Sequence, residues 1–205
     1  MDIMKWFRFP LTWFLLAIVV IAGLVAVGPE EARLGEHVRL VYLHAAWALT
    51  AEACFALAGL TGLAGLLLRR EKLHAWSAAL GRTGIIFWII YMPLSLWAMQ
   101  SNWNGLFLGE PRFRAAFILA VAGTLLQAGL LIMGRPVITS LVNVLFFSAL
   151  WILLRQAGYV LHPAPSPIFG SDNIALQLYF ILLVLVTLAA SWFLTRLLYH
   201  KNNLN

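Results

Sequence analysis

Apolar residues run along this chain in six long stretches, and short polar connections separate them. Each stretch is close to the roughly 20 mainly apolar residues that an α-helix needs to cross a bilayer. We therefore predict an all-α, polytopic membrane helical bundle with about six transmembrane helices in a single domain, residues 1–205. The predicted spans are residues 10–28, 38–68, 80–99, 113–133, 137–154 and 172–198.

The connections carry signals that begin, bend or end helices. The charged residues 69–72 end the second span, and Gly-Arg-Pro at 134–136 makes a tight turn after the fourth. Pro93 predicts a kink in the third span, and Asp172 is a suitable N-cap for the sixth. Short connections favour an up-and-down bundle in which consecutive helices are neighbours.

The first apolar stretch follows Lys5 and Arg8, an order that is also typical of secretory signal peptides. The stretch is long for such a signal, and Val-Gly-Pro at 27–29 is a weak cleavage site. We therefore interpret it as a retained first transmembrane helix.

Composition supports a membrane protein and argues against nucleic-acid binding. Hydrophobic residues make up 62% of the chain and charged residues only 11%, whereas soluble domains carry about 25% charged residues. A soluble fold of this length could not bury so much apolar surface. The net charge is +6, but no basic run with interleaved aromatic residues offers a nucleic-acid surface.

The distribution of Lys and Arg predicts the orientation in the membrane. Cytoplasmic segments of bacterial-type inner-membrane proteins are enriched in these residues. With the N-terminus inside, nine lie in cytoplasmic segments and five in outer segments, so we predict that both termini are cytoplasmic. The nine are Lys5, Arg8, Arg69, Arg70, Lys72, Arg82, Arg135, Arg196 and Lys201, and the five are Arg33, Arg39, Arg112, Arg114 and Arg155.

Two histidines are the first candidates for chemistry. His44 lies near the start of the second span and His162 in the fifth connection, so the predicted topology brings both to the outer face. Two neutral imidazoles can hold the axial positions of haem iron. Alternatively, His44 bonds a neighbouring helix and His162 lies in a hydrated loop. Cys54 is the only cysteine and no Cys-x-x-Cys-His motif is present, so a haem would be bound non-covalently.

Charged residues near this face add further candidates. Glu52 lies eight residues after His44, near the same helix face and roughly 12 Å along the axis. It is a candidate for proton-linked or quinone chemistry, or else a buried structural acid. Arg112 and Arg155 are candidate partners for haem propionates, or else interfacial anchors. We expect the remaining histidines to be solvated: His37, His74 and His200.

The connection after the third span is unusually apolar. It contains Trp103, Leu106, Phe107 and Leu108, and it leads to Arg112. Such a loop could lie in the membrane interface and offer a flat surface to a porphyrin. The alternative is an ordinary aromatic belt with anchoring arginines.

Several short motifs resemble the CcmC family of cytochrome c maturation proteins. Residues 38–44 (Val-Arg-Leu-Val-Tyr-Leu-His) resemble the start of that family's second helix, where a Tyr-x-His stretch supplies a periplasmic haem ligand. Residues 142–143 (Val-Asn) and 161–162 (Leu-His) resemble a later helix and the second ligand. The loop from 103 to 112 takes the place of the family's tryptophan-rich motif, roughly Trp-Gly-x-x-Trp-x-Trp-Asp-x-Arg. Here Trp103, Arg112 and a Glu110 for the Asp are present, and Leu, Phe and Gly replace the other tryptophans.

The resemblance implies a haem-handling membrane protein of cytochrome c assembly that is a carrier and not an enzyme. It would hold non-covalent haem b between His44 and His162, beside Trp103, with Arg112 and Arg155 at the propionates. A periplasmic haem chaperone and other membrane subunits of a maturation complex would be its partners. The alternatives are a subunit of a respiratory or photosynthetic redox complex with a resident bis-histidine b-type haem, and a cofactor-free structural or assembly subunit.

Overall fold

The computed structural model describes residues 9–31, 34–158, 168–170 and 172–202. Within these residues all extended regular structure is α-helical, apart from one isolated bridge between Glu31 and Gly35. The helices are α2 (Pro10–Ala26), α3 (Val38–Leu68), α4 (Glu71–Trp103), α5 (Pro111–Met133), α6 (Pro136–Gln156) and α7 (Ile174–Asn202).

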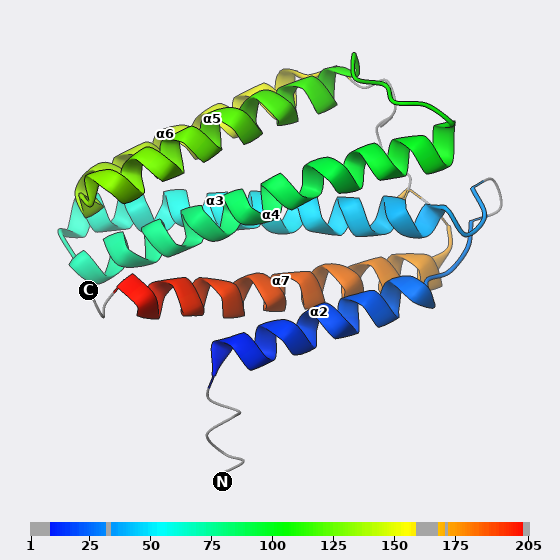
Figure 1. The fold of residues 1–205 in the computed structure, drawn as a ribbon, viewed down its shortest axis with the longest axis horizontal. Coiled ribbons are helices and arrows are strands. Elements are labelled where there is room, and N and C mark those ends of the chain that lie inside the picture. The colour runs from blue at the N-terminus through cyan, green and yellow to red at the C-terminus, as the bar shows by residue number, and fades with distance from the viewer. Residues whose placement is uncertain (1–8, 32–33, 159–167, 171, 203–205) are drawn as a thin grey trace, which may run out of the picture.

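The helices pack as three layers, each an antiparallel pair (Figure 1). The central layer is α3 with α4, the pair with the most extensive contact in the described chain. One outer layer is α5 with α6, and the other is α2 with α7. The outer layers both pack on the central pair, which therefore organises the bundle.

Five helices, α3 to α7, are long and apolar enough to cross a membrane, and α2 is a shorter apolar helix of 17 residues. Large hydrophobic side chains cover the outside of the bundle: Ile132 is 88% exposed and Leu125 is 69% exposed. Exposing a continuous apolar surface of this kind to water is unfavourable, whereas lipid chains solvate it. The all-helical, multi-pass membrane class that the sequence predicts agrees with this structure.

The helix α4 is longer than the predicted third span. It begins at Glu71 instead of residue 80 and continues to Trp103, over 33 residues. At 1.5 Å per residue it is about 50 Å long, well beyond a hydrocarbon core of about 30 Å. Hydropathy marks only the part of a helix that lies in lipid, so the polar first turns were missed. Pro93 lies inside this helix, which continues on both sides of it.

The cap of the last helix also differs from the prediction. Asn173, and not Asp172, caps α7, because its Oδ1 accepts a hydrogen bond from the Leu176 amide at 3.1 Å. Both residue types are good N-caps. Adjacent caps cannot be ranked from sequence, since the choice depends on where the backbone enters the helix.

Aromatic rings and hydroxyl pairs hold the layers together. Phe55 of α3 packs edge-on against Phe146 of α6, with ring centroids 4.9 Å apart. Toward the other layer, Thr50 donates to Thr187 at 2.7 Å, and Thr195 donates to Thr83 at 2.8 Å. Such bonds join helices where lipid offers no polar partner. The α7 helix is thereby fixed to both central helices.

Glycines on α3 allow the close approach of α4 and α6. A Cβ added at Gly62 would lie 2.9 Å from the Ser140 carbonyl oxygen and 2.9 Å from Ser77 Oγ. The first of these atoms is backbone and cannot rotate away. The packing of three helices therefore requires a residue without a side chain at this position.

We predict that Gly62→Ala lowers the free energy of unfolding by roughly 1–3 kcal/mol, because it forces helices apart in a packed core. Thermal unfolding of the detergent-solubilised protein, followed by circular dichroism, measures the effect. Gly129→Ala is the matched control: a Cβ there meets nothing within 4 Å, and alanine favours helix. Equal melting temperatures for the two variants would contradict the close packing at Gly62.

Candidate functional site

A cavity of about 390 Å³ lies at the end of the bundle where α3 and α5 begin and α4 ends. We call it the His44 cavity. Its lining combines a histidine, two carboxylates and an arginine with apolar and aromatic walls. The lining residues are His44, Ala45, Ala48, Leu49, Glu52, Trp88, Tyr91, Ser95, Met99, Glu110, Arg112, Phe113, Leu154, Ile168, Phe169 and Phe180.

One face of α3 supplies the polar side of this cavity. His44, Ala48 and Glu52 are four residues apart in sequence, so they lie above one another on the helix. All three line the cavity. The prediction that His44 and Glu52 share a face is therefore confirmed, and the small Ala48 leaves open space between them.

His44 is buried, with 6% of its surface exposed. Its Nδ1 lies 3.3 Å from the Leu40 carbonyl oxygen, and its ring stacks on Tyr91 at a centroid distance of 6.1 Å. A backbone carbonyl accepts a hydrogen bond, so this contact favours the tautomer with the proton on Nδ1. The lone pair is then on Nε2, as a metal-binding imidazole requires.

Glu110 has a structural role besides lining the cavity. It is the N-cap of α5, where its Oε2 accepts a hydrogen bond from the Phe113 amide at 2.5 Å. This cap fixes the first turn of α5 and with it Arg112. The Arg112 guanidinium is close enough to Glu52 for their charges to interact.

The apolar loop lies beside the cavity and does not line it. Trp103 is the last residue of α4, and Asn104 then turns the chain with a φ of 51°. Leu106 and Leu108 are 54% and 55% exposed. The loop ends at Glu110, a cavity residue. The loop thus forms an exposed apolar surface next to the cavity, and its placement in the membrane interface stays a prediction.

The remaining predicted site residues are not all brought to this cavity. Arg155 is exposed, and its guanidinium lies 4.3 Å from the centroid of the Trp151 ring, outside the cavity lining. His162 lies outside the described residues. The described chain resumes at Ile168, which does line the cavity, as does Phe169.

Sequence reasoning missed the contribution of α4. Trp88, Tyr91, Ser95 and Met99 follow one another at three- or four-residue spacing and form one face of that helix. Tyr91 and Ser95 interrupt an apolar span. Polar residues at helical spacing are the signal that could have identified this face.

His74 is a correction to the expectation that three histidines are solvated. His37 and His200 are exposed, but His74 is only 5% exposed and its Nδ1 lies 2.7 Å from Ser140 Oγ. The early start of α4 places His74 in the helix, where it packs against Gly65 of α3. The sequence indicated a solvated His74 because the charged residues 69–72 lie just before it.

Comparison of the chain with models of protein families, with curated proteins and with solved structures finds no match. The function must therefore be argued from the site itself.

We predict that Glu52 and Arg112 are energetically coupled. Arg112→Gln leaves the Glu52 carboxylate without its compensating charge and should destabilise the protein, and Glu52→Gln in the same chain should restore part of the loss. Residues that interact directly typically show coupling of about 0.5–3 kcal/mol in a double-mutant cycle, and thermal unfolding in detergent measures whether Glu52 and Arg112 do so.

The matched control pairs Arg112→Gln with Glu36→Gln, because Glu36 is exposed and is not a cavity residue. That cycle should be additive. Additivity in the Glu52 cycle as well would show that the two charges do not interact.

Proposed function

We propose that this protein is a haem-binding membrane protein in which His44 is one axial ligand of a non-covalent b-type haem. The observation that carries the proposal is the burial of His44 in a cavity that Arg112 also lines. Imidazole, guanidinium and aromatic walls are the groups that recognise haem iron, propionates and the porphyrin ring, respectively.

The local chemistry of His44 supports this role. Histidines that ligate metals usually donate the other ring N–H to a carbonyl or carboxylate, which fixes the ring and raises its basicity. The contact between Nδ1 and the Leu40 carbonyl oxygen is of this kind. Stacking on Tyr91 further restricts the rotation of the ring.

His162 is the proposed second ligand. Support comes from the chain that follows it, because Ile168 and Phe169 line the same cavity as His44. Arg112 is the proposed propionate partner, and Trp103 with the loop after it would lie beside the porphyrin. Arg155 is not included, since it lies over Trp151 outside the cavity.

The resemblance to the CcmC family, together with the exposed loop beside the cavity, favours a carrier that presents haem for delivery. A binding and delivery protein breaks no bond of its cargo and is not a conventional enzyme. In this proposal, its partners are a periplasmic haem chaperone and the other membrane subunits of a cytochrome c maturation complex. The proposed location is a bacterial-type inner membrane.

A second candidate function is a redox-complex subunit with a resident b-type haem. The specific observation in its favour is that Glu52 and Tyr91 line the same cavity as His44. A carboxylate at membrane depth is expensive unless it serves a partner or a proton path. In this alternative the carboxylate would assist quinone or proton chemistry next to the haem.

We predict a low-spin haem spectrum for the protein purified after expression with ample haem. Wild type should show a Soret band, sharp α and β bands on reduction by dithionite, and about one haem per chain. His44→Ala and His162→Ala should each lose or markedly weaken these bands, because each removes an axial ligand.

The matched control is His37→Ala, which removes an exposed imidazole seven residues before His44 and should leave the spectrum unchanged. A colourless, monodisperse wild type would contradict haem binding and leave a structural or assembly role. Bound haem that exchanges into an apo-acceptor supports a carrier, whereas haem that a quinol reduces reversibly and no acceptor removes supports the redox subunit.

We also propose that α2 completes six spans with both termini in the cytoplasm. The support is the excess of Lys and Arg in the segments assigned to that side. Fusion of a reporter that is active only in the cytoplasm should give signal at position 205 and at the α5–α6 turn, residues 134–135. A fusion in the loop at residues 104–109 should be silent. The reverse pattern would contradict the orientation.

A further inference from the structure

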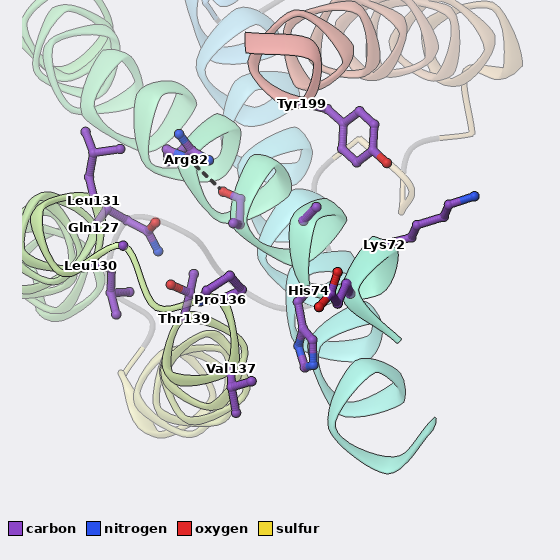
Figure 2. Close-up of a pocket in the computed structure, with 14 residues that line it drawn as sticks. Lys72, His74, Arg82, Gln127, Leu130, Leu131, Pro136, Val137, Thr139 and Tyr199 are labelled. Atoms are coloured by element: carbon purple, nitrogen blue, oxygen red, sulfur yellow. Dashed lines mark hydrogen bonds between the residues drawn. The ribbon is translucent and has the colours of Figure 1, made fainter. Parts of the chain in front are cut away.

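A second and larger cavity, of about 800 Å³, lies at the opposite end of α4 (Figure 2). We call it the Arg82 cavity. Four helices supply its wall: the first turns of α4, the last turns of α5, the start of α6, and Tyr199 of α7. It shares no lining residue with the His44 cavity, so it requires a separate explanation.

Two cations, Lys72 and Arg82, and one carboxylate, Glu71, line this cavity. Of these charged residues, Arg82 is the farthest from the start of α4. It is eleven residues from the start of α4, about 16 Å along the helix axis, and it is half-buried. Its Nε donates to the Ala78 carbonyl oxygen at 3.1 Å, which holds the side chain along α4. In Figure 2, Lys72 extends away from Gln127 and Thr139, so it lies at the rim.

Buried polar groups form one wall of the cavity and extend into the bundle. Gln127 Nε2 donates to Asn143 Oδ1 at 2.8 Å, and Asn143 Nδ2 donates to the Ser77 carbonyl oxygen at 2.9 Å. His74 contacts Ser140 as described above. These bonds fix the polar wall before any ligand enters, which reduces the entropic cost of binding.

The other wall is apolar and continues onto the lipid-facing surface. Leu131 and Val137 line the cavity and are 63% and 56% exposed. Beyond them, Ile132 and Leu141 are 88% and 48% exposed. The cavity therefore offers a cation inside and hydrocarbon at its side. A small soluble anion would contact the cation but would not need the hydrocarbon surface.

We propose that the Arg82 cavity binds the phosphate headgroup of an anionic phospholipid. The Arg82 guanidinium would contact the phosphate, and Lys72 would add positive charge at the rim. The acyl chains would follow Leu131 and Val137 into the bilayer. Basic pockets between transmembrane helices bind anionic headgroups for the same reasons, and guanidinium groups match phosphate oxygens in geometry and charge.

Native mass spectrometry of the delipidated full chain in detergent, with phosphatidylglycerol or phosphatidylcholine added, tests the proposal. We expect one phosphatidylglycerol to bind in preference to phosphatidylcholine. Arg82→Gln should weaken that binding by about tenfold, the effect of losing roughly 1.4 kcal/mol. Arg82→Lys, which keeps the charge, should retain most of it. Arg196→Gln is the matched control, because Arg196 is exposed and is not among the cavity residues.

A second pair of variants tests the site without changing a buried residue. Val137→Asp places a negative charge at the exposed mouth and should weaken phosphatidylglycerol binding, whereas the neutral Val137→Asn should not. Equal binding of both lipids to wild type, or equal losses in Arg82→Gln and Arg196→Gln, would overturn the proposal. Displacement of phosphatidylglycerol by an equal concentration of inorganic phosphate would assign the site to a soluble phosphate instead of a lipid.

Discussion

The close packing of α3 on α4 is the contact on which the other layers depend. Gly62 lets the Ser140 carbonyl of α6 and the Ser77 hydroxyl of α4 reach the α3 backbone, and Gly65 makes room for His74. Each outer layer packs on this central pair. Lipid gives no hydrophobic drive for helices to associate, so van der Waals packing at small residues and interhelical hydrogen bonds must supply the stability. The two cavities form at opposite ends of α4, where helices of different layers meet.

Buried and half-buried polar side chains in this bundle divide into two kinds. Thr50, Thr187 and Asn143 bond partners on other helices, and each such bond replaces one that water would make outside a membrane. Their role is structural and needs no ligand. His44, Glu52 and Arg112 instead converge on a cavity at one end of the bundle. The residues that line the cavity are therefore the candidates for function, because the interhelical hydrogen bonds of the first group already join the helices.

Most of the fold could be predicted from the sequence, because span length and hydropathy determine where helices cross lipid. The same-face placement of His44 and Glu52 followed from helical periodicity alone. The start of α4 could not be predicted, because hydropathy identifies only the apolar part of a helix. The first turns of α4 are polar and precede that part. The burial of His74 depends on that helix start and on Gly65 of another helix. Neither the α4 side of the His44 cavity nor the exclusion of Arg155 follows from spacing, because both depend on tertiary packing.

The free-energy cost of the Glu52 carboxylate, near the middle of α3, favours a function for the His44 cavity. A charged residue in the middle of a membrane helix costs about 2.5–3.5 kcal/mol on insertion scales, and a leucine at the position of Glu52 would avoid that cost. The N-cap that Glu110 forms on α5 partly explains why a carboxylate occupies position 110. The Glu52 carboxylate interacts electrostatically with Arg112, and both residues line the His44 cavity. Arg112 compensates part of this cost, and a ligand or a proton that uses the carboxylate would offset more of it.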